Sequence, residues 1–439
     1  MVAAKTTAKA AKKAPLARMP ATASPTKVQA APSHRQVAIR MYDVGFGDAF
    51  LVLIPDGARQ LRVLFDCGSI EASSAGGPMK DIVQKIIADV TDADGVARID
   101  VVVATHRHKD HVSGFADPAW NAVQVKEVWL PWTEHPTDGE ARRIRETQSR
   151  LAASLNAALA VAASQTSTDQ KRQLRVAHEI VSNALMLSND AAMKTLHSGF
   201  AGAPKRRFLP TKAADSRMIE PQVLPGVKVH VLGPSRDPEV IRDMDPPKGE
   251  SYLRSRAADA TLNDGLVAPF SPEFRLEASV GDWVFPIADQ REIESAGSLS
   301  DLAVAVALDK AVNGTSLMLV IDVSGTFLLF PGDAQWGTWA NVLADVEWRE
   351  LLQRVAFYKI GHHGSHNATP RTFVRNLLPM NCCAMASTLT RKIWPNIPKP
   401  TLLTGLLEKK AKIARSDLPG EAPKVFKVRD GVIEARVDF

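Results

Sequence analysis

The stretch Thr105-His106-Arg107-His108-Lys109-Asp110-His111 places three imidazoles and one carboxylate within six residues. The apolar run at residues 99–104 precedes it and predicts a buried strand, so the cluster follows the carboxyl end of that strand. Zinc, iron and manganese bind imidazole and carboxylate, and alternate side chains of an extended chain face the same side, so His106 and His108 can reach one ion. The turn at Asp110-His111 directs two more ligands to a neighbouring point. The alternative, a solvated turn rich in histidine, is disfavoured because the chain contains only 11 His.

Three further motifs stand in order along the chain. Met41-Tyr42-Asp43-Val44-Gly45-Phe46-Gly47-Asp48 precedes the histidine cluster, and Phe330-Pro331-Gly332-Asp333 and Lys359-Ile360-Gly361-His362-His363-Gly364-Ser365 follow it. Together with His106-x-His108-x-Asp110-His111 they resemble the signature of the metallo-β-lactamase-fold hydrolases, and most closely the hydrolase domain of the ComEC/Rec2 competence proteins. The resemblance extends from about residue 37 to residue 439, with a divergent stretch in the middle.

The resemblance implies an α/β fold: a metallo-β-lactamase-like αββα sandwich over residues 37–439, with a helical insertion at residues 138–200. It also implies two divalent metal ions, zinc or manganese, that activate a hydroxide for hydrolysis. The implied metal ligands are His106, His108, Asp110, His111, Asp333, His362 and His363. The first two hold one ion, Asp110 and His111 hold the second, and Asp333 bridges both. Either His362 or His363 completes the second site, with a slight preference for His362.

The resemblance assigns further roles around the centre. Asp66 follows the strand predicted at residues 61–65 and is expected to hold the histidine loop through hydrogen bonds, unless it is an ordinary turn aspartate. The predicted catalytic set is Asp66, Asp110 and Asp333. The residues predicted to bind substrate are Asp43, Asp48, Lys359 and Ser365. The last of these is expected to cap the next helix or to contact a phosphate.

The third ligand of the first ion is left open by the sequence. The histidines in the interval where related enzymes supply it are His135, His178, His197 and His230. Each is equally explained as an ordinary surface or core histidine. Gly233-Pro234 and Trp394-Pro395 stand where the family often has His-Pro, so an imidazole is missing at both positions. The first site is therefore expected to be open, weaker or suited to manganese.

Positive charge is concentrated near the amino terminus. The net charge is +6, and residues 1–36 contain seven basic side chains and no acidic one, which leaves the remainder near −1. This segment has too few apolar side chains to offset its ordering entropy, so we predict a disordered basic tail. Its lysines are expected to bind nucleic-acid phosphates without sequence preference. The alternatives are a solubilising tail and an organellar presequence.

Apolar runs and cysteines indicate the compartment. No apolar run approaches the roughly 20 residues that span a bilayer, and the amino terminus lacks the apolar core of a secretory signal. Cys67, Cys382 and Cys383 are odd in number and two are adjacent, which argues against a disulfide framework. These observations predict a cytoplasmic protein without membrane contact.

The predicted elements alternate between strands and helices. Strands are predicted at residues 36–41, 49–54, 61–65, 99–104, 125–130, 227–232, 315–323, 326–330, 355–360 and 382–386. Helices are predicted at residues 79–90, 140–163, 169–196, 336–354 and 370–378, and residues 201–225 are predicted to be a loop. The two helices of the insertion carry many arginines, which form a solvated face, a cap over the site, or an arm that binds a second copy or a partner protein.

These predictions together favour a metal-dependent hydrolase, and within that class a nuclease or phosphodiesterase. One alternative is a small-molecule metallohydrolase that acts on a cyclic nucleotide, a lactone or a thioester. The other is a nucleic-acid-binding protein whose metal site is not catalytic.

Overall fold

The computed structural model describes residues 35–163, 186–213, 217–247, 249–252, 308, 310–391 and 395–439. All of them belong to one structural unit, residues 35–439. Four predictions fall wholly or largely outside the described residues: the tail at residues 1–36, the first half of the helix at residues 169–196, His178 and Trp394.

One mixed sheet has eight strands among the described residues, in the order β14-β15-β1-β2-β3-β4-β5-β6. The strands are Gln36–Tyr42 (β1), Phe50–Asp56 (β2), Arg59–Phe65 (β3), Arg98–Val103 (β4), Gln124–Pro131 (β5), Lys205–Leu209 (β6), Lys427–Arg429 (β14) and Val432–Asp438 (β15). The ladders from β14 to β3 are antiparallel, and those from β3 to β6 are parallel. The carboxyl ends of β3, β4 and β5 therefore lie at the same end of this sheet.

The second mixed sheet has seven strands in the described part of the chain, in the order β13-β12-β11-β10-β9-β8-β7. They are Met218–Ile219 (β7), Val227–Gly233 (β8), Met318–Val323 (β9), Thr326–Phe330 (β10), Val355–Lys359 (β11), Cys383–Ala386 (β12) and Lys412–Arg415 (β13). The ladders from β13 to β10 are parallel, and those from β10 to β7 are antiparallel. The carboxyl ends of β10, β11 and β12 again lie together.

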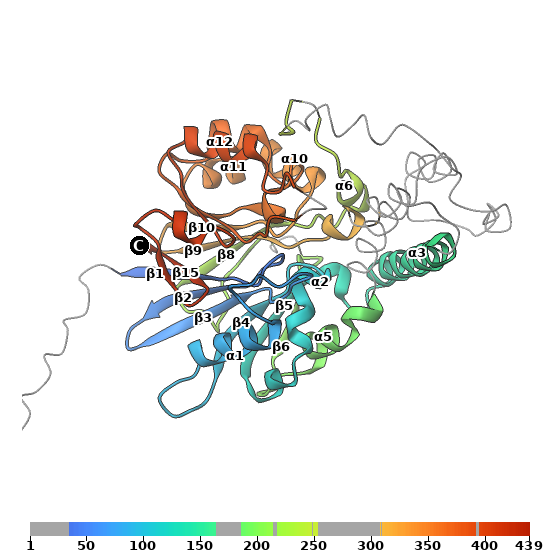
Figure 1. Cartoon of the computed structure of the whole chain (residues 1–439), viewed down its shortest axis with the longest axis horizontal. Helices are drawn as coiled ribbons and strands as arrows, with labels where there is room; N and C mark the ends of the chain where they lie inside the picture. Colours follow the sequence, from blue (N-terminus) through green and yellow to red (C-terminus); the bar gives the residue numbers. More distant parts are fainter. Residues whose placement is uncertain are drawn as a thin grey trace, which may run out of the picture. The chain divides into compact units, whose positions relative to one another are not determined.

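The two sheets share a buried apolar core. Val37, Ile39 and Val63 of the first sheet lie in one cluster with Leu319 and Ile321 of the second. The opposite face of each sheet is covered by helices, which Figure 1 shows on the two outer sides of the pair of sheets. This helix–sheet–sheet–helix order follows from strands that are apolar on both faces, since each face must be buried against another element.

Two sets of helices cover the sheets. Against the first sheet lie Met79–Asp89 (α1) and Met186–Ser198 (α5). Against the second lie Trp336–Ala344 (α10), Val346–Leu352 (α11) and Pro400–Glu408 (α12). The remaining α-helices described are Lys109–Val112 (α2), Gly139–Ala163 (α3) and Pro238–Arg242 (α6). None of the described helices is both long and apolar enough to cross a bilayer.

The structure confirms the α/β class, corrects two predicted segments and adds two elements that were not predicted. Residues 201–225 were predicted to be a loop but contain β6 and β7; β6 is stabilised by main-chain pairing with β5 rather than by an apolar pattern of its own. The helix predicted at residues 336–354 is two helices. They are separated at Asp345, whose side chain accepts a hydrogen bond from the Trp348 backbone N–H at 3.1 Å and so begins α11. Near the carboxyl terminus, α12 and β13 were not predicted.

A ring stack joins the sheets where the polar loops begin. Phe65, the last residue of β3, stacks on Phe330, the last residue of β10, with ring centroids 4.0 Å apart and planes 6° apart. Asp66 follows the first ring directly, and Asp333 comes three residues after the second. Packing between the sheets therefore fixes the separation of two loops that carry predicted site residues.

Candidate metal centre

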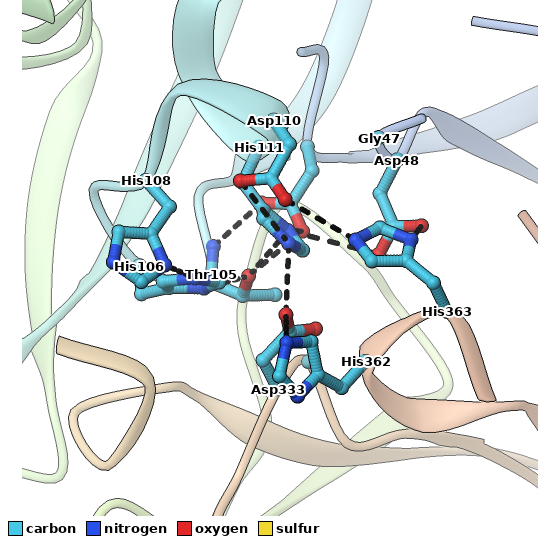
Figure 2. Close-up of polar contacts among 12 residues, drawn as sticks. Gly47, Asp48, Thr105, His106, His108, Asp110, His111, Asp333, His362 and His363 are labelled. Carbon is cyan, nitrogen blue, oxygen red and sulfur yellow. Dashed lines mark hydrogen bonds and ion pairs between the residues drawn. The ribbon is translucent and has the colours of Figure 1, made fainter. Parts of the chain in front are cut away.

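The predicted metal-binding side chains lie together at the carboxyl ends of three strands, β4, β10 and β11 (Figure 2). These side chains are His106, His108, Asp110, His111, Asp333, His362 and His363. Two of them, His111 and His363, are fully buried, whereas the side chain of His362 is 18 % exposed to solvent. The fold therefore brings these side chains, which come from three separate parts of the sequence, to one place.

His111 is at the middle of the cluster and has a carboxylate at each ring nitrogen. Its Nδ1 lies 2.8 Å from Asp66 Oδ2, and its Nε2 lies 3.2 Å from Asp333 Oδ2. Asp66 also accepts hydrogen bonds of 2.7 Å from the backbone N–H and the hydroxyl of Thr105. Asp66 thus holds the first residue of the histidine loop and fixes the His111 ring, as a carboxylate behind a metal-binding imidazole does.

His106 and His108 face each other across a short gap. The Nε2 atom of His106 lies 3.0 Å from Nδ1 of His108, and the Thr105 hydroxyl lies 3.2 Å from Nδ1 of His106. Burial lowers the pKa of both imidazoles, that of His108 to about 4. Both rings are therefore neutral at physiological pH and present a lone pair, which is the form that binds a metal.

His363, rather than His362, lies beside Asp110. Nδ1 of His363 is 2.8 Å from the carbonyl oxygen of Ser387 and must donate its hydrogen to it, so Nε2 is turned toward Asp110 Oδ2 at 3.2 Å. His362 Nε2 lies 3.8 Å from Asp333 Oδ2 instead. The geometry therefore groups His363 with Asp110 and His111. The sequence had left His362 and His363 open, with a slight preference for His362.

Three groups of candidate ligand atoms among the described residues share His111, and the predicted ligand His108 belongs to none of them. They are His106, His111 and Asp333; Asp110, His111 and His363; and Asp48, Asp66 and His111, with the ligand atoms of each group within 4.8 Å of one another. The first two groups mark neighbouring positions at which three protein atoms converge. Their imidazole and carboxylate donors fit zinc, manganese or iron.

Carboxyl groups outnumber the one ammonium group among the buried side chains of the centre. Four buried carboxylates and one ammonium lie in the described part of the centre: Asp48, Asp66, Asp110, Asp333 and Lys359. Burial alone would lower the pKa of His111, but the carboxylates around it outweigh burial and raise that pKa well above its ordinary value. For Asp333, burial alone would raise the pKa, but His111, His362 and Lys359 hold it well below its usual range. A buried excess of carboxylates is stabilised by cations, so the charge of the site also fits divalent metal ions.

Three residues predicted to bind substrate have partners inside the protein. Asp43 accepts hydrogen bonds from the Gly45 backbone N–H at 3.1 Å and from the Ser73 hydroxyl at 2.7 Å, and so holds the loop after β1. Asp48 and Lys359 form a buried ion pair with each other. Burial alone would lower the pKa of Lys359, but Asp48 and Asp333 raise it, so the ammonium stays charged. Contact of these residues with a substrate remains a prediction.

The fourth, Ser365, begins a chain of hydrogen bonds behind Asp333. Its hydroxyl donates to Asn367 Oδ1 at 2.8 Å, the Asn367 amide donates to Gln335 Oε1 at 2.8 Å, and the Gln335 amide donates to the carbonyl oxygen of Asp333 at 3.0 Å. This chain connects the loop after β11 to the loop after β10. Asn367 and Gln335 were not predicted, since both lie outside the motifs and an amide has no charge pattern to mark it.

Close backbone packing joins the loop after β1 to the histidine loop. A Cβ added to Gly47 would lie 2.1 Å from the Gly68 carbonyl oxygen and 2.7 Å from that of Asp110. The Asp48 backbone N–H donates to the same Asp110 oxygen at 2.9 Å. Gly47 is therefore required for close approach, which explains the glycine before the last aspartate of the first motif.

The described candidates for a third ligand of the first ion lie elsewhere. His135 packs against an aromatic ring, Nε2 of His197 lies 3.8 Å from Glu134, and Nε2 of His230 lies 3.9 Å from Asp322. None of these imidazoles belongs to the ligand groups found among the described residues. In the described part of the chain, Asp333 and His111 are the side chains that join His106.

Comparison with known proteins does not identify the function of this chain. No protein-family model matches the chain, and no curated protein matches its sequence. Buried imidazoles and carboxyl groups from separate strand ends form a donor set for a divalent cation.

Proposed function

We propose that this chain is a metal-dependent hydrolase of the metallo-β-lactamase fold and that its substrate is a phosphodiester, as in nucleic acid. The observation that carries the proposal is the convergence of His106, Asp110, His111, Asp333 and His363 into two adjoining ligand groups. Three of the four motifs that resemble the ComEC/Rec2 hydrolase domain supply these residues in the same order along the chain, and the other supplies Asp48.

The donor set supports two ions in this proposal. The first position takes Nε2 of His106 with His111 and Asp333, and Nδ1 of His108 lies 3.0 Å from that His106 nitrogen. The second position takes Asp110, His111 and His363. A pair of divalent cations would supply an activated water at neutral pH and neutralise charge on the phosphoryl group.

The chain's own residues orient these donors. Asp66 holds Nδ1 of His111, and the Ser387 carbonyl holds Nδ1 of His363, so that both Nε2 atoms face the carboxylates of the centre. Lys359 lies between Asp48 and Asp333 and helps to hold the pKa of Asp333 below its usual range. A pair of divalent cations would offset the negative charge that a phosphodiester adds, which favours this substrate over a neutral lactone. The seven basic residues at positions 1–36 also favour a polyanion.

The experiment is cleavage of single- and double-stranded DNA and RNA, and of bis(p-nitrophenyl) phosphate, with added Mn²⁺ or Zn²⁺. The wild type is compared with Asp333→Asn, which keeps the shape of the side chain but removes the charge. The matched control is Asp190→Asn, exposed on α5. We expect metal-dependent cleavage by the wild type and the control, and none above the metal-free level by Asp333→Asn.

Two other outcomes count against the proposal to different extents. If folded, metal-loaded wild type leaves every polymer and the small phosphodiester intact, the phosphodiester substrate is wrong. Cleavage of a lactone or thioester that is lost in Asp333→Asn would then retain the metallohydrolase and replace its substrate. Cleavage that survives in Asp333→Asn would contradict the assignment of the centre itself.

A further inference from the structure

Arg107, which separates His106 from His108, forms a buried ion pair. Its Nε lies 2.7 Å from Glu134 Oε1, and its Nη2 lies 2.5 Å from Glu134 Oε2. The Arg107 side chain is only 6 % exposed to solvent and that of Glu134 only 3 %. Glu134 belongs to the short helix Trp132–Glu134 (η3) at the end of β5. The side chain between two proposed ligands is thus held by two parallel hydrogen bonds, the most directional geometry that an arginine can adopt.

The backbone of Arg107 is held as well, by a residue of the helical insertion. The Asn189 side-chain amide on α5 donates a 2.7 Å hydrogen bond to the Arg107 carbonyl oxygen, and Asn189 is 2 % exposed. At the penultimate position of the same helix, Nε2 of His197 lies 3.8 Å from Glu134 Oε2. Ala192 and Leu196 bury α5 against the first sheet. The described part of the insertion is therefore packed into the core and contacts the histidine loop.

The ion pair is poorly explained by stability alone. Removing two charges from water costs several kcal/mol per ion in general, and an apolar pair of similar volume is often as stable or more stable. Nη1 of Arg107 is also buried without a hydrogen-bond partner among the described residues, which adds to that cost. What the pair supplies is a fixed position for the peptide that joins His106 to His108.

We propose that Arg107, Glu134 and Asn189 are positioning residues that hold His106 and His108 in the geometry required by a divalent cation. The insertion is then part of the metal centre and not only a surface for a partner. This inference rests on the metal-dependent function proposed above. It concerns the affinity and geometry of the metal site, so its test does not depend on knowing the substrate.

The first test replaces Asn189 by Asp, which has the same shape but cannot donate to the Arg107 carbonyl when ionised. Asp190→Ala, at the exposed neighbouring position, is the control. Mn²⁺ and Co²⁺ affinities are measured by calorimetry, and the visible absorption of bound Co²⁺ reports ligand geometry. We expect Asn189→Asp to weaken binding roughly 10- to 100-fold and to change the Co²⁺ spectrum, as is typical when support behind a ligand is lost. The control should match the wild type.

The second test separates positioning from stability. The double variant Arg107→Met with Glu134→Leu replaces the ion pair by apolar side chains of similar volume and should melt near the wild-type temperature without metal. We expect its metal affinity to fall as in Asn189→Asp. Wild-type affinity and Co²⁺ spectrum in either folded variant would overturn the proposal. Failure of the wild type to bind any divalent ion would instead overturn the proposed function, and this inference with it.

Discussion

Two consecutive histidines of the centre adopt a backbone conformation that side chains disfavour. His362 has φ 46° and His363 has φ 53°, both in the left-handed region. Each such residue costs about 1–2 kcal/mol. The conformation is maintained because the His363 ring is tied to the Ser387 carbonyl and the His362 backbone N–H donates to the Gly332 carbonyl at 3.4 Å. Strain of this kind is concentrated at functional sites, where it places a side chain that a relaxed turn would place elsewhere.

The first prediction concerns this strain. His362→Gly should raise the free energy of unfolding of the metal-free protein by roughly 0.5–1 kcal/mol, because glycine adopts a positive φ without the steric cost. The same change should weaken metal binding. The control is His135→Gly, where φ is −61° and glycine only adds chain entropy, so stability should fall. Denaturation in EDTA measures both variants, and a loss of stability in His362→Gly as large as that in the control would contradict the strain.

At the level of residues, spacing and strand ends predicted which polar side chains would lie near one another, but not the groups that hold them in place. His106 to His111, Asp333 and His363 follow predicted strands, so their convergence could be inferred. The pairing of Asp48 with Lys359 could not, because the two belong to different sheets and their contact depends on how the sheets pack. The Ser387 carbonyl could not be predicted either, since every residue has one.

Among the elements, the short helix after β5 and helix α5 act together on the histidine loop. The predicted insertion begins at residue 138, four residues after Glu134, and its arginines were expected to form a solvated face, a cap or an arm. Helix α5, in the second half of the insertion, is buried through Ala192 and Leu196. Periodicity predicted that helices exist here, but not which of their faces meets the core. Glu134 could have been noticed, since it follows a strand as the other site residues do.

The second prediction uses the pKa of Glu134. Burial alone would raise it, but Arg107 and His197 outweigh burial and hold it well below its ordinary value. A carboxylate whose pKa is lower in the folded than in the unfolded protein stabilises the fold at pH values above its unfolded-state pKa, which is about 4.3 for glutamate. This contribution is lost progressively as the pH falls from that value toward the folded-state pKa. Glu134→Gln should therefore cost about 3–5 kcal/mol at pH 7, where it leaves Arg107 buried and unpaired.

The pH dependence gives the test of this prediction. Denaturant unfolding of wild type and Glu134→Gln at several pH values should show a difference that shrinks between pH 5 and pH 3, because only the wild type loses stability through this carboxylate. The matched control is Glu140→Gln, at the start of α3 outside this ion pair. A difference that is constant with pH would show that the ion pair with Arg107 does not lower the pKa of Glu134.

For the whole molecule, the centre depends on two sheets meeting at their polar ends. Strand and helix patterns were sufficient for the α/β class and for most elements. These patterns were not sufficient to predict the order of the strands. The last two strands, β14 and β15, come from the end of the chain and lie beside β1, and the sequence does not indicate this pairing. The Phe65–Phe330 stack is the contact that converts this topology into a fixed separation of Asp66 and Asp333.

The third prediction tests that coupling. Phe330→Ala should lower the free energy of unfolding by about 3–5 kcal/mol through cavity formation, and should also weaken metal binding because the Asp333 loop loses its support. Phe426→Ala removes a buried ring of the same core that adjoins none of the site loops in sequence. It should lower stability while leaving metal affinity unchanged. Unfolding and calorimetric titration of both variants provide the comparison, and equal metal affinities would contradict the coupling.

The central claim is that the cluster around His111 and Asp333 binds two divalent ions. The most direct measurement is an anomalous-difference map from crystals of the protein loaded with Mn²⁺ or Zn²⁺. We predict two peaks roughly 3.5–4 Å apart, one beside His106 and His108 and the other beside Asp110 and His363. A map from well-loaded crystals without a peak at this cluster would contradict the claim.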